Sequence, residues 1–232
     1  PPGIEAFLTI GALVSLKNWV LNGIVDPVHP AALILFLTFL AMALLTRKSF
    51  CSWICPVGTL SELLWRSGER LTGHRFRFWR WLDILLRSVK YLLLFFFLQL
   101  ILFGMPAQAL KGFLSSPYWA MSDVKMLHFF TDPSVLSVVI VLTLVVLSFF
   151  IRQFWCRYLC PYGAMLGFFS FFSPFRVRRD RDGCTGCRSC DRVCPASIAV
   201  SGKQQVFSME CTGCLSCVQS CPEHQVLQMG VG

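Results

Sequence analysis

The chain has 232 residues, of which 55% are hydrophobic and 14% are charged, and its formal net charge at pH 7 is +9. A soluble domain usually carries about 25% charged residues, so the composition excludes an ordinary water-soluble globular protein and favours one that is partly dissolved in lipid. The excess of positive charge needs no nucleic-acid partner, because the basic residues are distributed as they are in membrane proteins.

Four apolar stretches follow one another along the chain, and a membrane-spanning helix needs about 20 apolar residues. Residues 4–25 contain charged side chains and either cross the membrane or lie at its surface. Residues 31–46 are short but uncharged, and residues 83–104 carry basic side chains near their beginning that can reach the headgroups. Residues 134–151 are uncharged throughout. We therefore expect an α-helical integral membrane domain with three or four transmembrane helices over residues 1–175.

Lysine and arginine are distributed unevenly between these stretches. Residues 47–80 contain seven of them and the chain from Arg152 onward contains nine, whereas residues 105–133 contain two. Because cytoplasmic segments of membrane proteins are richer in basic residues, we expect a multi-pass protein of the bacterial cytoplasmic (inner) membrane. Both basic segments should lie on the cytoplasmic side, and residues 105–133 should form a long loop outside. The first residue is proline rather than methionine and no cleavable signal peptide is recognisable, so we expect residues upstream.

Two copies of a CxxxCP motif lie in the part of the chain that is expected in the membrane. Their cysteines are Cys51, Cys55, Cys156 and Cys160. The segments RKSFCSWICPVGTL and RQFWCRYLCPYGAM align without a gap, so they form an internal repeat. A glycine follows each Cys-Pro pair, and we expect Gly58 and Gly163 to allow close packing of helices rather than phosphate binding.

The two motifs predict a further metal site. Positions four apart lie on one face of an α-helix, about 5–6 Å apart between Cβ atoms, so each motif is expected to present its two thiols together. If the copies pack around a pseudo-twofold axis, four thiols converge at the cytoplasmic membrane face as a third iron–sulfur or other metal site. The neighbouring Arg47, Arg152 and Arg157 favour the thiolate that a metal requires. The alternative is that the four cysteines are buried, inert thiols.

The remaining eight cysteines form two runs of the pattern Cys-x2-Cys-x2-Cys-x3-Cys-Pro, which is the ligand pattern of bacterial ferredoxins. In that pattern, three cysteines of one run hold a cluster together with the fourth cysteine of the other run. The cluster 1 set is therefore Cys184, Cys187, Cys190 and Cys221, and the cluster 2 set is Cys211, Cys214, Cys217 and Cys194. We expect a small α+β ferredoxin module with two [4Fe–4S] clusters over residues 176–232.

Disulfide bonds and zinc fit these cysteines less well than iron–sulfur clusters do. Cytoplasmic cysteines are normally reduced, so a disulfide framework does not fit the expected location. Four-cysteine zinc sites are common structural elements. However, zinc ribbons rarely place four cysteines in one such run, and here the run occurs twice.

Two segments of the ferredoxin module carry further expectations. Residues 196–210 link the two runs and should supply a small core and a short hairpin-like connection. The apolar residues of this link are Ile198, Val200, Val206 and Phe207. The basic segment RVRRDR at 176–181 is interpreted as a lipid anchor, at about 1 kcal/mol per basic residue. Docking of an acidic electron-transfer partner is the alternative.

Together, the segments FCSWICPVGTL at 50–60 and CRYLCPYGAM at 156–165 and the two ferredoxin runs resemble the membrane polyferredoxins. This family includes the quinol-dehydrogenase subunit of periplasmic nitrate reductase and the iron–sulfur half of the nitrous-oxide reductase regulator. The similarity extends over nearly all of the chain. The resemblance implies a redox relay that exchanges electrons between membrane quinones and a partner such as a periplasmic reductase or a multihaem cytochrome.

Three functions fit these patterns. The first is an iron–sulfur electron carrier between the quinone pool and a redox partner, of the quinol-dehydrogenase type. The second is an electron donor for maturation or metal reduction of a metalloenzyme, fed from the cytoplasm. The third is a structural iron–sulfur subunit without turnover of its own. Reduction potentials would separate them, because protein surroundings move the potential of a cluster over hundreds of millivolts.

No quinone site can be assigned from the sequence. Oxidation of a quinol releases protons, so such a site needs a base beside an apolar slot. The candidate bases and their aromatic neighbours are Asp26, His29, Asp123, His128, Trp119 and Tyr118 outside, and Glu62, Glu69, His74, Trp65 and Trp79 inside. Simpler interpretations are turn residues for Asp26 and Asp132, the latter capping the next helix, and interfacial anchors for the aromatic residues. The chain has no dinucleotide fingerprint, phosphate loop or nucleophile elbow.

Overall fold

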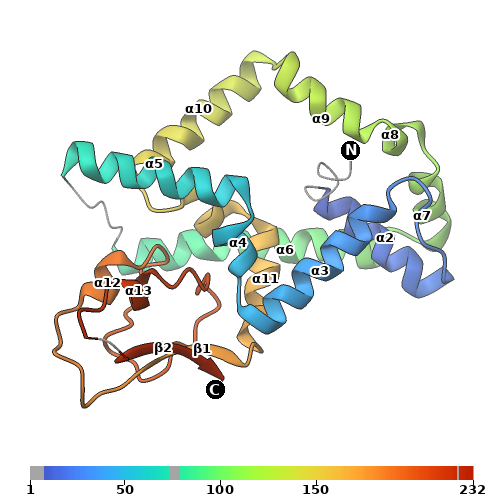
Figure 1. Cartoon of the computed structure of the whole chain (residues 1–232). Coiled ribbons are helices and arrows are strands. Elements are labelled where there is room, and N and C mark those ends of the chain that lie inside the picture. The colour runs from blue at the N-terminus through green and yellow to red at the C-terminus, as the bar shows by residue number, and fades with distance from the viewer. Residues whose placement is uncertain (1–7, 74–78, 224, 232) are drawn as a thin grey trace. The chain divides into compact units, whose positions relative to one another are not determined.

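The computed structural model describes residues 8–73, 79–223 and 225–231, and the chain is mostly helical (Figure 1). It divides into two compact units, one made of Pro1–Phe39 and Leu92–Thr143 and the other of Leu40–Tyr91 and Leu144–Gly232. Each unit is therefore built from two separate segments of the chain. The predicted boundary between residues 175 and 176 divides the chain differently and stays a prediction.

The first unit is built from short helices. It contains α2 (Thr9–Asn22), the beginning of α3 (Pro30–Thr46) and the end of α6 (Arg80–Gly104). The residues after α6, expected to form a loop, are largely helical, in α7 (Ala107–Leu114), α8 (Pro117–Ala120) and α9 (Ser122–Thr131). The core of this unit consists of Val14, Ile101, Leu110, Leu114 and Trp119.

The hydrogen bonds of Lys17 explain why this charged residue lies in the first apolar stretch. Its ammonium group donates hydrogen bonds to the carbonyl oxygens of Ile101 at 2.8 Å, Leu102 at 2.9 Å and Met105 at 2.6 Å. The last carbonyls of a helix have no partner within the helix, and a cation there also complements the helix dipole. Lys17 of α2 therefore caps the end of α6.

One helix within the described part of the chain, Trp81–Gly104, is long and apolar enough to cross a membrane. A second span is counted if Val124–Thr131 and α10 (Val135–Phe150) are taken together, although these two helices meet at a bend of 78°. The apolar helix α3 has 17 residues and is shorter than a full span. The expected three or four transmembrane helices are therefore not confirmed.

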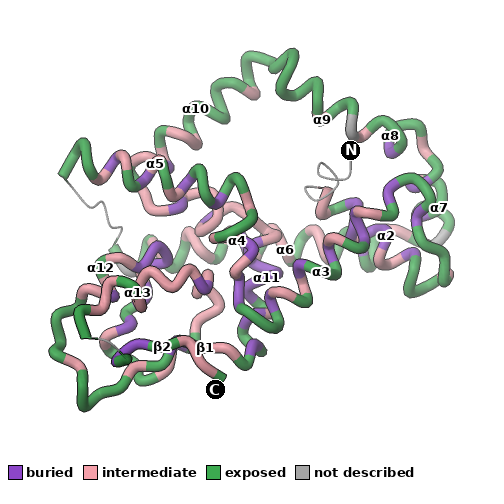
Figure 2. The backbone as a smooth tube through the Cα atoms, in the orientation of Figure 1, coloured by how far each residue is buried: buried purple, intermediate pink, exposed green. Residues whose placement is uncertain are grey.

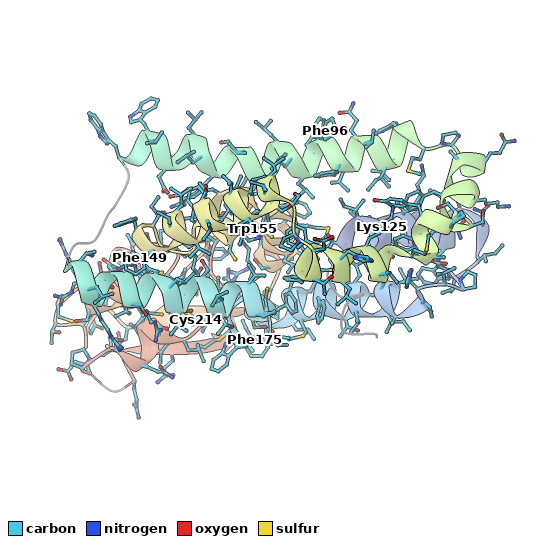
Figure 3. All side chains as sticks on the ribbon, turned by 90° about the horizontal axis from the view of Figure 1, so that it is seen from above. Phe96, Lys125, Phe149, Trp155, Phe175 and Cys214 are labelled. Carbon is cyan, nitrogen blue, oxygen red and sulfur yellow. The ribbon has the colours of Figure 1, made fainter. Side chains whose placement is uncertain are left out.

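In the second unit, α11 (Pro161–Phe171) is buried along much of its length (Figure 2). This unit also contains α4 (Ser49–Trp53), α5 (Pro56–Thr72) and the π-helical turn η1 (Trp155–Leu159). Helix α5 lies against the end of α10, as Figure 3 shows near Phe149. A Cβ atom added to Gly68 would overlap with the carbonyl oxygen of Phe149, so glycine is required at this contact.

The ferredoxin module is closed by a two-stranded antiparallel sheet. Strand β1 (Phe175–Arg179) pairs with β2 (Leu227–Val231), so that the two ends of the module lie side by side (Figure 1). The module also contains two short helices, α12 (Ser189–Val193) and α13 (Ser216–Gln219). The basic segment that was interpreted as a lipid anchor contributes residues to β1.

The link between the two cysteine runs supplies part of the core, as predicted. Ile198, Val200 and Val206 are buried, whereas Phe207 is 45% exposed, so the expectation is confirmed for the first three and wrong for Phe207. The prediction of a hairpin-like connection is also wrong for the described residues of this link. They contribute one isolated bridge, between Gln205 and Arg178, because β1 takes β2 as its full-length partner.

Candidate functional site

Each CxxxCP motif contains a helix break. Cys51 lies in α4 and Cys156 in η1, whereas Cys55 and Cys160 directly precede α5 and α11. The backbone of these two residues is extended, with φ −69° and ψ 117° at Cys55 and φ −74° and ψ 107° at Cys160. A residue before proline is pushed out of the α conformation. The expectation that both thiols of a motif share one helix face is therefore wrong.

The two motifs nevertheless adopt the same local structure. The amide of Cys55 donates to the carbonyl oxygen of Phe50 at 2.9 Å, and the amide of Cys160 donates to that of Trp155 at 3.0 Å. Both hydrogen bonds join residues five apart, which is the spacing of a π-helix, and such turns are frequent at functional sites. The sequence repeat is therefore also a structural repeat.

The four CxxxCP thiols lie close enough together to influence one another's charge. Burial raises the pKa of Cys51 to about 12, and the nearby Cys160 and Cys55 thiols add to this rise. Burial also raises the pKa of Cys156, with further contributions from Cys160, Cys51 and Cys55. Such mutual effects require short distances. Cys51 and Cys156 therefore need a strong electrophile such as a metal to lose their protons, and burial alone would keep these two thiols inert.

Gly58 is required for this arrangement and Gly163 is not. A Cβ atom added to Gly58 would overlap with the carbonyl oxygen of Cys51. At Gly163 the corresponding nearest atom is the carbonyl oxygen of Cys156 at 3.5 Å, an ordinary contact. The predicted close packing is confirmed at the first position and wrong at the second.

The arginine that begins each repeat contacts the ferredoxin module. Arg47 is 1% exposed and donates to the carbonyl oxygens of Phe175 at 2.9 Å, Val206 at 2.8 Å and Ser208 at 3.2 Å. Arg152 donates at 2.8 Å to the carbonyl oxygens of Cys194 and Arg192. These two side chains attach the module to the CxxxCP helices, a role that the sequence did not reveal.

The third arginine, Arg157, binds Asp83 at the beginning of α6. Its guanidinium contacts the two carboxylate oxygens at 2.8 and 2.9 Å, and the hydroxyl of Tyr158 donates to the same carboxylate at 2.6 Å. Arg87 forms a further ion pair with Asp83. Arg157 also donates to the hydroxyl of Ser197 at 3.0 Å, so it too reaches the ferredoxin module.

A lysine that sequence reasoning missed stands near the CxxxCP thiols. Lys48 is 4% exposed, and its positive charge partly offsets the effect of burial on the pKa of Cys51, Cys156 and Cys160. A lysine three residues before the first cysteine of a motif, next to the arginine that begins the repeat, is the sequence signal that could have revealed it. Lys48 is therefore a better candidate than the three arginines for stabilising thiolates here.

The cluster 2 set also lies together. Burial raises the pKa of Cys217 to about 12, and Cys194, Cys214 and Cys211 contribute to the rise. Burial raises the pKa of Cys194 to about 11, again with contributions from Cys211 and Cys214. The amide of Ile198 donates to the sulfur of Cys194 at 3.4 Å, which is the kind of N–H to sulfur contact expected around an iron–sulfur cluster.

The cluster 1 set surrounds a pocket near the protein surface. All four of its cysteines line this pocket, together with Arg179 and Arg188. Arg179 donates to the sulfur of Cys184 at 3.2 Å, and hydrogen bonds from the Gly186 amide and from Arg179 lower the pKa of Cys184. The cysteine sets thus gather as predicted, while their role as ligands stays a prediction.

The donor chemistry fits iron–sulfur clusters better than single ions. In the part of the chain that the structure describes, no three His, Cys, Asp or Glu side chains are placed to hold one metal ion. A [4Fe–4S] cube spreads its four thiolates over four iron atoms, so its ligands stand farther apart than those of a single ion. Twelve reduced cysteines in three groups of four meet that requirement in number and type.

Three of the candidate quinone residues, Asp26, His29 and Trp119, form a buried polar group. The indole N–H of Trp119 donates to the carboxylate of Asp26 at 2.7 Å, and the other oxygen of this carboxylate accepts from the amide of Val28 at 3.0 Å. His29 lies 3.1 Å from the carbonyl oxygen of Trp119. The interpretation of Asp26 as a turn residue is confirmed.

The other candidates are scattered. Glu62 pairs with Arg66 at 2.6 Å, and Trp65 lies under the guanidinium of Arg152. Tyr118 and Trp79 are exposed. His128 is also exposed and Glu69 is half-buried, whereas His74 and the side chain of Asp123 lie outside the described residues. The hydroxyl of Ser134, rather than Asp132, accepts the capping hydrogen bond from Ser137 at the beginning of α10.

Comparison with protein families assigns iron–sulfur domains to most of the chain. Residues 28–78 and 133–179, which contain both CxxxCP motifs, match the family described as "4Fe-4S binding domain". Residues 176–222 match the family described as "4Fe-4S dicluster domain". No solved structure matches the chain.

Curated relatives cover most of this chain. YccM of Escherichia coli (strain K12), provisionally assigned to electron transport, is 49% identical over 90% of this chain and 58% of its own length. Protein NirI of Paracoccus denitrificans is 31% identical over 83% of this chain and 28% of its own length. The regulatory protein NosR of Stutzerimonas stutzeri is 28% identical over 82% of this chain and 25% of its own length. The chain thus spans little more than half of YccM and about a quarter of the other two.

Proposed function

The chain belongs to the NosR-like family of iron–sulfur electron-transfer proteins, and we propose that it is a membrane-bound relay that moves electrons between the quinone pool and a redox partner. The observation that carries this proposal is the combination of three four-cysteine groups with a chain that is 55% hydrophobic. An iron–sulfur cluster accepts and releases one electron at a time without rearranging its ligands, and an apolar chain gives access to a lipid-soluble donor.

Two of the cofactors are assigned to the ferredoxin module. Cys184, Cys187, Cys190 and Cys221 would hold one [4Fe–4S] cluster, and Cys211, Cys214, Cys217 and Cys194 would hold the other. The protein contributes hydrogen bonds to the sulfurs, from Arg179 to Cys184 and from the Ile198 amide to Cys194. These bonds favour the thiolate and tune the potential at which an electron is held.

The third cofactor is assigned to the CxxxCP motifs. Cys51, Cys55, Cys156 and Cys160 would hold it, which is supported by their common neighbourhood and by the match of residues 28–78 and 133–179 to a 4Fe-4S binding domain. Anaerobically purified protein should then contain about twelve irons per chain, four for each cluster. A double variant, Cys51→Ser with Cys156→Ser, should lose about four of them. If the wild type contains about eight irons per chain and the double variant retains them, this part of the proposal is left without support.

The membrane topology and the quinone complete the proposal. The helix Trp81–Gly104 would span the membrane, and α3, α10 and the stretch containing α2 would supply the remaining spans. The CxxxCP motifs and the ferredoxin module would lie on the cytoplasmic side, where basic residues concentrate. The partner would be a periplasmic reductase or a multihaem cytochrome.

Quinol oxidation is tested directly on the purified protein. Anaerobic addition of a short-chain quinol should reduce the protein, and the reduced clusters should give an electron paramagnetic resonance signal. Dithionite serves as the control, because it reduces accessible clusters whether or not a quinone site exists. Reduction by dithionite without any reduction or oxidation by quinone couples of different potential would reject the quinone part of the proposal and leave the iron–sulfur assignment intact.

A further inference from the structure

The CxxxCP helices and the ferredoxin module meet at a buried network of charges. Lys90 of α6 places its ammonium group 2.7 Å from each carboxylate oxygen of Glu210. Lys48 lies 3.6 Å from the same carboxylate, and the hydroxyl of Tyr91 donates to it at 3.0 Å. The side chains of Lys90, Lys48 and Glu210 are 0%, 4% and 14% exposed. Water therefore contributes little to the solvation of these charges.

This network has more positive than negative charge. Two ammonium groups and one hydroxyl donor surround the carboxyl group of Glu210, and all of them favour its ionised form. Glu210 is thus a carboxylate at neutral pH and neutralises one of the two lysines. Leaving a buried ammonium group without a counter-ion costs several kcal/mol. Among the described residues, Glu210 is the one carboxylate with which the two lysines form ion pairs.

The position of Lys48 indicates where the missing negative charge belongs. Its carbonyl oxygen accepts from the amide of Cys51 at 3.0 Å, so the residue is fixed at the first CxxxCP motif. Its ammonium group packs on Gly167 of α11, where an added Cβ atom would lie 2.7 Å from Nζ and 2.8 Å from the carbonyl oxygen of Met209. Met209 and Glu210 directly precede Cys211. Lys48 therefore stands between the CxxxCP motifs and the cluster 2 set.

The same placement appears in the electrostatics of the thiols. The charge of Lys48 favours the thiolate of Cys51, Cys156 and Cys160 on one side. It also favours the thiolate of Cys211 on the other side, where Arg47 acts in the same direction. Lys48 does not contribute to the pKa shifts of Cys184, Cys187 and Cys190 in the cluster 1 set.

We propose that Lys48 is the shared counter-charge of two thiolate sites, the one made by the CxxxCP cysteines and the one that contains Cys211. The proposal rests on the iron–sulfur assignment made above. Four thiolates outweigh the positive charge of an iron–sulfur core, so each loaded site is an anion and supplies the negative charge that the network lacks. Because reduction adds a further negative charge, a nearby ammonium group stabilises the reduced form and raises the reduction potential.

The test compares three variants with the wild type. Lys48→Met removes the charge and keeps an unbranched side chain, Lys48→Arg retains the charge, and Glu210→Gln removes the opposing charge. Lys203→Met is the control. It removes a lysine that is exposed on the ferredoxin module, and water screens the charge of this lysine. Iron and acid-labile sulfide are measured first. Potentials then follow from redox titrations monitored by electron paramagnetic resonance, with signals assigned by the cysteine variants.

An electrostatic role predicts opposite signs for the two charge removals. Lys48→Met should shift the one-electron redox equilibrium of two clusters, the one at the CxxxCP cysteines and cluster 2, at least tenfold toward the oxidised form. A tenfold shift corresponds to about 59 mV. Glu210→Gln should shift both toward the reduced form, Lys48→Arg should restore most of the wild-type value, and Lys203→Met and the cluster 1 signal should change little.

Several outcomes would overturn the proposal. Unchanged reduction potentials in Lys48→Met would do so. A change in the potential of only one of the two sites would also do so, because it would show that the charge is not shared. A fall of both potentials in Glu210→Gln as well as in Lys48→Met would indicate a packing role instead. If Lys48→Met does not accumulate, Glu210→Gln alone must still raise both potentials. Quinone chemistry plays no part in these readouts, so its failure would be recognised separately.

Discussion

At the scale of single residues, the described structure uses its buried charges to join segments that are far apart in the sequence. Asp83 is the clearest case, because Arg87, Arg157 and the hydroxyl of Tyr158 all converge on one carboxylate. Sequence reasoning treated residues 83–104 as an apolar span and gave Asp83 no role. An acidic residue at the beginning of such a stretch offers no local pattern that identifies partners more than seventy residues away.

Asp83→Asn should therefore destabilise the protein. The substitution keeps the shape of the side chain but leaves Arg157 without its ionic partner, next to a tyrosine that is 3% exposed. The expected loss is about 1–3 kcal/mol, and each kcal/mol should lower the melting temperature of the detergent-solubilised protein by about 2–4 °C. Glu62→Gln, which removes an exposed i,i+4 ion pair with Arg66, should cost less than about 0.5 kcal/mol. Equal effects of the two variants would contradict the role assigned to Asp83.

At the scale of elements, the sequence predicted the existence of the repeat but not its conformation. The aligned motifs have matching π-type hydrogen bonds at Cys55 and Cys160, which supports the repeat. The helical-face argument failed because proline at the first position of α5 and α11 forces the preceding cysteine into an extended conformation. The grouping of the ferredoxin cysteines was predictable because it depends on spacing alone. The pairing of β1 with β2 was not, because the link between the runs was the nearer candidate for a strand pair.

The repeat offers a matched pair of substitutions. Gly58→Ala should displace α5 from Cys51, because the added methyl group would overlap with a backbone carbonyl that cannot move independently. Gly163→Ala places the same methyl group 3.5 Å from the carbonyl of Cys156 and should be tolerated. We expect Gly58→Ala to lower the iron content by up to four irons per chain, the content of one cluster, and Gly163→Ala to match the wild type. Similar iron contents in the two variants would show that the close approach at Gly58 is not needed for assembly.

At the scale of the second unit, the ferredoxin module is attached to the CxxxCP helices by arginine contacts to backbone carbonyls. Arg47 and Arg152 are equivalent positions of the repeat, and each donates to carbonyls of the module. Guanidinium groups suit this task because they carry five donors in a fixed plane. The repeat therefore supplies both thiols and arginines. Its cysteines build the CxxxCP site, and its arginines bind the ferredoxin module next to that site.

Arg47→Met should loosen this attachment without removing any cysteine. The substitution removes one donor from each of the carbonyl oxygens of Phe175, Val206 and Ser208. The Ser173 hydroxyl still donates to Phe175 and the Cys211 amide still donates to Ser208, so we expect a cost of about 1–3 kcal/mol, chiefly from the buried acceptor at Val206. Because Phe175 begins β1, amide hydrogen exchange in β1 and β2 should become faster than in the wild type. Arg178→Met, at an exposed position of the same strand, is the control and should leave exchange unchanged. If exchange in β1 is as slow in Arg47→Met as in this control, the module is held by other contacts, and Arg47 would act chiefly through its charge near Cys211.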